Sequence, residues 1–226
     1  MERVVVFTGA GVSAESGLRT FRDGDGLWEQ YRIEEVATPQ AWHRNPELVL
    51  RFYDERRAQV LAAQPNAAHL AIAALQERFE VRVITQNIDD LHERAGSKEV
   101  MHLHGDILLA RSTVDPAYVT PINGPSLRLG DFCPLGSQLR PHIVWFGEEV
   151  PLIPEAAEVF ARADRVLVVG TSLNVYPAAG LVQCARPTAT MVLVDPKSVN
   201  VRRPGLRTIQ APASQGVPQI VREWLA

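Results

Sequence analysis

A glycine-rich turn near the start of the chain is the feature that most constrains the fold. Residues 3–7 are an apolar, β-branched run typical of a buried strand, and Gly9-x-Gly11-x-x-Ala14 follows directly. This spacing is typical of the turn that opens a helix in dinucleotide-binding folds. Gly9 permits a tight turn, Gly11 lets the backbone approach a pyrophosphate, and Ala14 keeps the helix near the sheet. The helix start then favours an anion. An ordinary strand–turn–helix of small residues is the alternative.

Composition excludes several classes of protein. The 226 residues fit one large α/β domain, or one domain with a smaller insert, and can bury a core without staples. Net charge −3, from 23 basic and 26 acidic residues, argues against nucleic-acid binding. No apolar run approaches the roughly 20 residues that span a bilayer. The cysteines Cys133 and Cys184 indicate a reducing compartment. Because a strand at residue 3 leaves no room for a signal peptide, we expect a cytoplasmic protein.

The segment after the glycine turn departs from a conventional dinucleotide-binding half. Such a half would place a second strand shortly after residue 23, ending in an acidic residue for the ribose. Residues 27–63 instead show helical spacing, with Pro39 and Pro46 as helix starts. This predicted helical excursion argues against a hydride-transferring dehydrogenase.

The rest of the chain alternates strand and helix patterns. Strands are predicted at 81–85, 100–103, 166–169, 190–194 and near 208–209, and helices at 66–79, 154–163, 178–184 and 217–225. The alternation predicts a Rossmann-like, doubly wound parallel sheet covered on both faces. Residues 107–141 lack periodicity and predict a loop-rich insert. We therefore expect a Rossmann-like, dinucleotide-binding type of domain at 1–23, 64–106 and 142–226, and a small domain formed by two insertions at 24–63 and 107–141.

Polar clusters follow several predicted strands. They occupy residues 9–23, 86–89 and 170–172, and His104 follows a fourth strand. Open α/β sheets bind ligands at the carboxyl ends of their strands. Packing alone does not explain so many polar ends, so the sequence predicts a composite binding site there.

These motifs together resemble one family. The segments GAGVSAESGLRTFR, TQNIDDLH, LHGD, IVWFGE and GTSLNVYPAA, in this order, resemble the sirtuins, which are NAD-dependent protein-lysine deacylases. The resemblance implies NAD as co-substrate, acylated-lysine proteins bound as extended peptides, and the products nicotinamide, O-acyl-ADP-ribose and free lysine. A plain deacetylase, an ADP-ribosyltransferase and a non-catalytic NAD-binding module are the alternatives.

The resemblance also implies residue roles. It makes His104 the catalytic base, with Asn87 as a second catalytic residue, and imidazole suits proton transfer near neutral pH. His102 and His92 are better candidates for local hydrogen bonds at strand ends. The residues implied to bind NAD are Gly9, Ala10, Gly11, Glu15, Thr20, Phe21, Arg22, Gln86, Asn87, Asp89, Gly170, Thr171, Ser172, Asp195, Pro196, Lys197 and Ala213. Those implied to bind the substrate peptide as extra strands are Val144, Trp145, Phe146, Gly147, Asn174 and Val175.

A Tyr-x-x-Arg pair within the excursion bears on the acyl group. Tyr53 and Arg56 fall on one helix face, where the plain interpretation is a solvated surface. The resemblance implies more, because the sirtuins that remove succinyl and malonyl groups carry Tyr and Arg at this spacing. Arginine offers a planar fork to a carboxylate, and tyrosine adds a hydroxyl donor. Ala37 matches a small residue that leaves room for the longer acyl chain, and Arg57 is a less well spaced alternative to Arg56.

The zinc motif of the family is degenerate. Most sirtuins hold a structural zinc through two Cys-x-x-Cys pairs. Here the first pair reads Ser112-x-x-Asp115, and the second keeps only Cys133. The spacing of Asp115, His102 or His142 does not support any of them as a substitute ligand. We expect no structural zinc, with apolar packing in its place by Leu108, Leu109, Val114, Tyr118, Leu127 and Phe132.

Overall fold

The computed structural model describes residues 1–18, 27–28, 31–199 and 203–226. The chain divides into two compact units. Unit 1 comprises Met1–Thr20, Gln64–Leu103 and Val150–Ala226, and unit 2 comprises Phe21–Ala63 and His104–Glu149. Across the described ranges, no helix is both long and apolar enough to cross a membrane.

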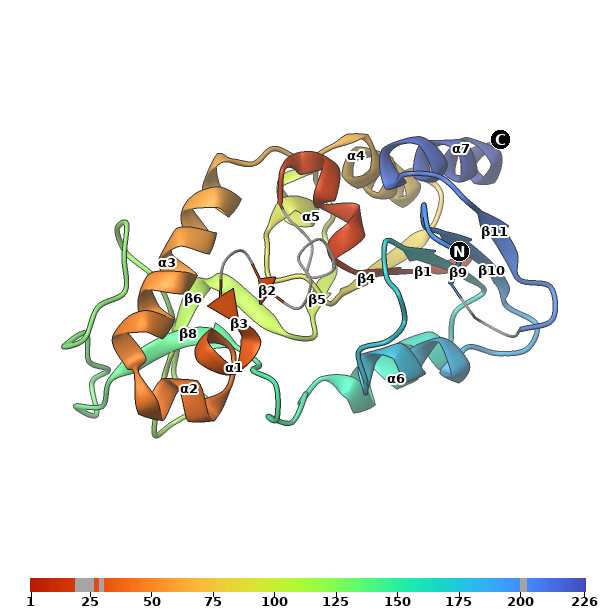
Figure 1. Ribbon diagram of the computed structural model, residues 1–226. Helices are drawn as coiled ribbons and strands as arrows, with labels where there is room; N and C mark the ends of the chain where they lie inside the picture. The colour runs from red at the N-terminus through yellow and green to blue at the C-terminus, as the bar shows by residue number, and fades with distance from the viewer. Residues whose placement is uncertain (19–26, 29–30, 200–202) are drawn as a thin grey trace. The chain divides into compact units, whose positions relative to one another are not determined.

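Unit 1 is built on a parallel sheet of six strands in the order β11-β10-β9-β1-β4-β5. Their bounds are Arg3–Thr8 (β1), Glu80–Thr85 (β4), Val100–His102 (β5), Arg165–Val169 (β9), Thr190–Val194 (β10) and Arg207–Ile209 (β11). The predicted Rossmann-like sheet is confirmed (Figure 1). The strand that pairs with β1 comes later in the chain than in a conventional dinucleotide-binding half. It is β4, which lies directly beside β1 with Val4 opposite Val81.

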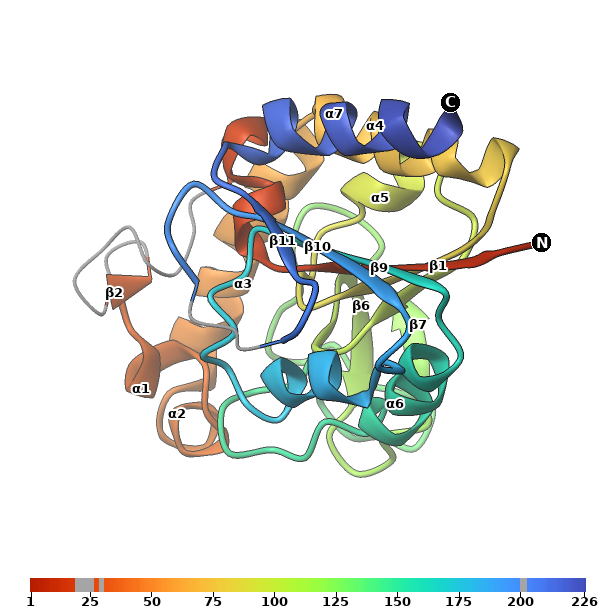
Figure 2. The same cartoon turned by 90° about the vertical axis from the view of Figure 1, so that its right-hand side faces the viewer.

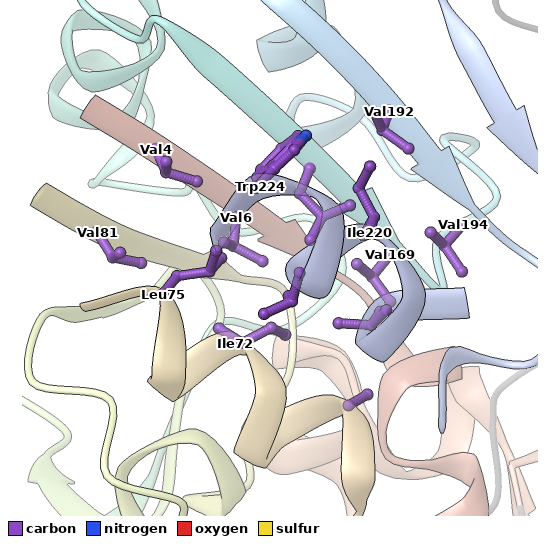
Figure 3. Close-up of a cluster of buried hydrophobic side chains, with 14 of the residues drawn as sticks. Val4, Val6, Ile72, Leu75, Val81, Val169, Val192, Val194, Ile220 and Trp224 are labelled. Carbon is purple, nitrogen blue, oxygen red and sulfur yellow. The ribbon is translucent and has the colours of Figure 1, made fainter. Parts of the chain in front are cut away.

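Helices cover both faces of this sheet (Figure 2). On one face, α4 (Ala67–Ala74) and α7 (Ala213–Leu225) pack together over the sheet. Figure 3 shows their core, in which Ile72 and Ile220 meet strand residues such as Val6. On the other face lie α6 (Ile153–Ala161) and the 3₁₀ segment η4 (Ala178–Cys184). There the rings of Phe7 and Phe160 pack edge to face with centroids 5.6 Å apart.

Three predicted helices of unit 1 differ from the expectation. The glycine turn opens two 3₁₀ turns, η1 (Ala10–Val12) and η2 (Ala14–Ser16), and no α-helix. The left-handed Gly17, with φ of 89°, ends the second turn. The helix predicted at 66–79 is divided into α4 and the 3₁₀ turn η3 (Leu75–Glu77), and η4 replaces an α-helix at 178–184. Over such short segments, the spacing of apolar residues does not distinguish a 3₁₀-helix, with three residues per turn, from an α-helix, with 3.6.

Unit 2 combines helices with a small sheet. The excursion contains β2 (Leu27–Trp28), β3 (Tyr31–Arg32), α1 (Ile33–Val36), α2 (Pro39–Arg44) and α3 (Pro46–Ala62). The predicted proline starts are confirmed, since the side chains of Thr38 and Asn45 cap α2 and α3 directly before them. The loop-rich prediction for 107–141 was wrong in part. Antiparallel strands β6 (Gly105–Ser112), β7 (Val119–Pro121) and β8 (Leu139–Ile143) form a sheet in the order β7-β6-β8. A register shift between Asp106 and Ala110 interrupts the alternation that would have revealed β6.

Candidate functional site

In unit 1, the predicted polar loops lie at the carboxyl ends of neighbouring strands. Main-chain hydrogen bonds join these loops to each other. The N–H of Gly9 donates to the carbonyl of Val169 at 3.0 Å, Gly11 donates to Gly170 at 2.8 Å, and Gly170 donates to Val194 at 3.0 Å. The structure therefore brings the ends of β1, β9 and β10 into one continuous edge, where an open α/β sheet binds its ligand.

The glycines at this edge are required by contact between the loops themselves. A Cβ on Gly11 would lie 2.7 Å from the Cα of Gly170. Gly170 has φ of +59°, and a Cβ there would lie 2.4 Å from the nitrogen of Val12. Neither position has room for a side chain. The turn therefore presents bare main chain, which is the kind of surface that binds a pyrophosphate in dinucleotide-binding folds.

Ser13, which our sequence analysis did not single out, is the centre of a buried cluster. Its hydroxyl donates to Oδ2 of Asp89 at 3.0 Å and accepts from Nδ2 of Asn87 at 3.1 Å. It also contacts Nε2 of His69 at 3.4 Å. We call these residues the serine–asparagine cluster: Ser13, His69, Asn87 and Asp89. The cluster fixes two predicted site residues, and the only sequence signal for Ser13 is its place in the glycine motif.

The protonation states in this cluster follow from its partners. The N–H of Asn66 donates to Nδ1 of His69 at 3.2 Å, so the proton of a neutral His69 lies on Nε2 and points to Ser13. Burial lowers the pKa of His69 to about 4. Burial also raises the pKa of Asp89, although hydrogen bonds from Leu91 and Ser13 oppose this. His69 is therefore neutral near pH 7.

A second buried histidine supports the same loop from β1. Nε2 of His92 lies 3.0 Å from Oγ1 of Thr8, whose hydroxyl donates to Oγ1 of Thr85 at 2.8 Å. That second oxygen accepts the N–H of Asn87 at 3.0 Å. Burial lowers the pKa of His92 well below its usual value, so it is neutral and donates from Nε2. As expected, His92 forms a hydrogen bond at a strand end.

The remaining unit 1 predictions fall around this edge. Nε2 of Gln86 donates to Oγ1 of Thr171 at 3.0 Å, and Oδ1 of Asp195 accepts the N–H of Lys197 at 2.8 Å. Glu15 accepts both bonds of Ser214, at 2.9 Å from its N–H and 2.6 Å from its hydroxyl. Ala213 is buried at the start of α7, and Ser172 is half-buried. The exposed members are Ala10, Asn174, Val175, Pro196 and Lys197. Thr20, Phe21 and Arg22 lie outside the described residues.

In unit 2, His104 begins the segment that leads into β6. Its side chain is half-buried, and its carbonyl accepts the N–H of Val144 at 2.9 Å. The next residue, Gly105, has φ of +88°, and a Cβ there would lie 1.9 Å from the carbonyl oxygen of His142. Only glycine fits, and the close approach of β6 and β8 holds His104 beside the predicted peptide-binding segment.

A partly buried ion-pair cluster anchors that segment. Glu148 accepts from Nη1 of Arg140 at 2.7 Å, from Nη2 of Arg111 at 3.3 Å, and from the N–H of Trp145 at 2.8 Å. The Arg140 guanidinium lies 3.3 Å from the centroid of the Trp145 ring. We call these residues the arginine–glutamate cluster: Arg111, Arg140, Trp145 and Glu148. Although burial alone would raise the pKa of Glu148, the bonds from Arg140 and Trp145 hold it below its usual value.

This cluster leaves the middle of the segment presented to solvent. The N–H of Phe146 donates to the carbonyl of Ala37 at 3.0 Å, which ties the segment to the end of α1. Phe146 and Gly147 are exposed, whereas Trp145 is buried. The exposed part of the segment is a turn and not an extended strand, because the N–H of Glu148 donates to the carbonyl of Trp145 at 3.0 Å. Binding of a peptide here as an added strand stays a prediction.

Tyr53 and Arg56 are buried on α3, which contradicts the solvated-surface alternative. Their exposed fractions are 0% and 6%, and Ala37 in the same unit is 2% exposed. Burial raises the pKa of Tyr53 above its usual range, so the phenol is a neutral donor. Arg57 is committed elsewhere: its Nη2 donates to Asp54 at 2.5 Å and to the carbonyl of Pro125 at 3.1 Å.

The residues at the degenerate zinc motif do not fit a zinc ion. Sγ of Cys133 lies 3.5 Å from Oγ of Ser112 and 3.4 Å from Oγ of Ser137, and these hydroxyls are 2.8 Å apart. A structural zinc site needs four thiolate or imidazole ligands, and this one offers a single thiol. In the part of the chain that is described, no group of three His, Cys, Asp or Glu residues is placed to hold a metal. The absence of zinc stays a prediction.

Apolar packing at this motif was expected and was wrong in part. Leu127 is buried, but Val114 and Phe132 are 67% and 61% exposed. The side chains of Ser112, Cys133 and Ser137 bond to one another at this motif. Hydrogen bonding between the polar remnants, which no apolar pattern reports, joins the ends of β6 and β8 instead.

Comparison with known proteins agrees with this arrangement. Residues 9–177 match the Sir2 family. The chain is 50% identical over 204 residues to an NAD-dependent protein deacylase of Helicobacter pylori, covering 90% of this chain and 89% of that protein. It superposes on a Sir2 homologue in complex with ADP-ribose with a TM-score of 0.88 and 39% identity, covering 97% and 90% of the two chains. A Sir2 homologue in complex with NAD gives a TM-score of 0.85 at 40% identity, covering 98% and 88%.

Proposed function

Because this chain belongs to the Sir2 family and is an NAD-dependent protein deacylase, we propose that its preferred substrates are lysines carrying succinyl or malonyl groups, with acetyl-lysine a weaker substrate. One observation carries this preference. Tyr53 and Arg56 lie one turn apart on α3, and both side chains are buried, as a corner that recognises a carboxylate requires. A charge-assisted contact of this kind is worth about 1.5–3 kcal/mol, or ten- to a hundredfold in discrimination.

The chemistry of each group supports this assignment. The neutral phenol of Tyr53 donates one hydrogen bond, and the guanidinium of Arg56 offers a fork that matches a carboxylate. Nη1 of Arg56 donates to the neutral amide oxygen of Gln59 at 3.2 Å, whereas Nη2 of Arg57 is ion-paired with Asp54 and also donates to Pro125, which makes Arg57 the weaker candidate. Ala37, in the same unit, has a small side chain, as the proposal of a four-carbon acyl group requires.

We assign the reaction to the predicted residues in the following way. The turn from Gly9 to Gly11 and the loops at 86–89, 170–172 and 195–197 bind NAD, and Asn87 and Asp89 hold its nicotinamide ribose end. The acyl oxygen attacks C1′ of that ribose and expels nicotinamide. His104 then accepts a ribose hydroxyl proton, so that the alkoxide captures the acyl carbon. Val144–Gly147 and Asn174–Val175 bind the peptide main chain. The free cysteines Cys133 and Cys184 support a cytoplasmic location.

Kinetics with matched peptides test the acyl preference. Arg56→Met should lower kcat/KM for a succinyl-lysine peptide about tenfold or more and leave the acetyl-lysine peptide within about twofold. Nicotinamide release measures both. Arg51→Met is the control, because Arg51 is an exposed arginine on the same helix. Equal losses on both peptides would remove the carboxylate role of Arg56. His104→Ala should abolish nicotinamide-coupled deacylation of either peptide.

A further inference from the structure

His102 and Glu93 form a pair beside Asn87 that the reaction scheme above does not use. His102 is the last residue of β5, and Glu93 lies in the short helix α5 (Leu91–Arg94). Nε2 of His102 is 2.7 Å from Oε1 of Glu93, and Nδ1 is 2.9 Å from the carbonyl oxygen of Asn87. The ring therefore bridges a carboxylate and the main chain of a predicted catalytic residue.

The two partners fix the charge of the ring. A carbonyl oxygen can only accept a hydrogen bond, and so can an ionised carboxylate. Both nitrogens of His102 must then donate, which makes the side chain an imidazolium. The charged and titratable groups that interact with it include Glu93, Asp89 and His92, and of these His92 is neutral. The Glu93 carboxylate at 2.7 Å favours the charged form of the ring.

Asn87 is held at three points, and His102 supplies the one that carries charge. Its N–H donates to Thr85 at 3.0 Å, its side-chain amide donates to Ser13 at 3.1 Å, and its carbonyl accepts from His102. The first two bonds are made to neutral hydroxyls. Charge-assisted bonds are about twice as strong as neutral ones, so the third bond most restricts rotation of the peptide after Asn87.

We propose that Glu93 and His102 act as a positioning pair that fixes the main chain of Asn87 for the NAD-cleavage step. The pair touches neither substrate in this role. The inference rests on the proposed role of Asn87. The alternative is an ordinary surface ion pair. The side chain of Glu93 is 41% exposed, and such pairs contribute little to global stability. A positioning role therefore predicts a loss of activity without a comparable loss of stability.

Glu93→Gln and His102→Gln test the pair in the full-length protein. Each should lower kcat/KM for NAD about tenfold, equivalent to about 1.4 kcal/mol, with KM for the acyl peptide within about twofold and Tm unchanged. The double variant should be no worse than His102→Gln, since partners in one unit are not additive. Glu99→Gln is the matched control, because Glu99 is an exposed acid of the same unit paired with Arg82. Additive losses, or a Tm loss that accounts for the activity, would reduce the pair to a structural contact.

The pH profile separates positioning from packing. At high pH His102 loses a proton, and one of its two bonds is lost, so kcat/KM for NAD should fall along an alkaline limb. Glu93→Gln removes the anion that stabilises the imidazolium and should move this limb to lower pH. Imidazole ¹⁵N NMR would report the charge directly, and a neutral ring at pH 7 would overturn the proposal. Should His102→Gln not fold, Glu93→Gln alone decides the question.

Asn87→Ala in the same assay keeps this inference distinct from the proposed function. If Asn87→Ala retains activity, the proposed role of Asn87 fails, and the pair has nothing to position. If Asn87→Ala is inactive while Glu93→Gln and His102→Gln behave like the wild type, only the positioning pair fails. Loss in all three variants, with the Glu99→Gln control unaffected, supports both.

Discussion

The serine–asparagine cluster of unit 1 and the arginine–glutamate cluster of unit 2 both hold a loop in place, with opposite chemistry. The first consists of hydrogen bonds with a histidine kept neutral by burial, around one carboxylate. The second consists of two arginines that share one glutamate, with an indole beneath one of them. A neutral histidine gains a proton as acid is added, whereas the glutamate stays ionised below its usual pKa. The two clusters should therefore lose their stabilising interactions at different pH values.

Removing the shared carboxylate should have the largest effect on stability. Glu148→Gln leaves Arg140 and Arg111 without their anion, at side-chain exposures of 10% and 15%. Breaking a fully buried pair from one side costs about 3–5 kcal/mol, and this partly buried cluster should lose an amount at the lower end of that range. Urea unfolding measures this loss, and Glu149→Gln, an exposed neighbour, should change nothing. A loss of the same small size in both variants would mean that the arginine–glutamate cluster is not an anchor.

Acid should weaken unit 1 first. The pKa of His69 is about 4 in the folded protein and near its usual 6.5 in the unfolded chain. Between these values the unfolded chain binds more protons, so stability falls as pH is lowered from about 6.5 to 4, by about 3 kcal/mol. His69→Gln should make this limb shallower in urea titrations at several pH values, and the slope that remains belongs to His92, whose pKa burial also lowers. His43→Gln, at an exposed site, should keep it. The contribution of Glu148, whose pKa is depressed, is lost only at lower pH.

Removing the Thr8 hydroxyl tests whether its hydrogen bonds to His92 and Thr85 stabilise the serine–asparagine cluster. Thr8→Val preserves shape and removes the acceptor of His92 and the donor to Thr85. Leaving His92 unsatisfied at 0% exposure should cost about 2 kcal/mol. Thermal unfolding of Thr8→Val beside Thr190→Val, at an exposed strand start, measures the difference. No difference between them would show that the hydroxyl chain does not support the loop.

The smallest effect is expected at the degenerate zinc motif. A chelator should leave Tm and deacylase activity unchanged, because Ser112, Cys133 and Ser137 already bond to one another. Elemental analysis of the purified protein should find no stoichiometric zinc. One zinc per chain, or a Tm that falls on chelation, would contradict this and would make unit 2 dependent on metal and not on its arginine–glutamate cluster.

The sheet was predictable because β1, β4, β9 and β10 are largely apolar runs whose partners follow from α/β topology. The polar clusters were predictable only in part. Asn87 and Asp89 follow a strand and were identified, but Ser13 and His69 meet across 56 positions of sequence. Glu148 directly follows the predicted peptide-binding segment 144–147 and was not singled out, and its arginine partners come from two strands that pair at a shifted register. Residue types are local information, and hydrogen-bond partners are not.

The long excursion between β1 and β4 has a consequence for the integrity of the chain. Each doubling of loop length adds only about 0.6 kcal/mol to the cost of closing the loop, so the excursion lowers the stability of the sheet little. β1 pairs with β4 on one side and with β9 on the other. A single proteolytic cut within 46–62 would therefore leave the amino-terminal fragment, which carries the central strand, bound by both neighbours. The two fragments should complement each other when mixed, and neither alone should form the nucleotide-binding edge.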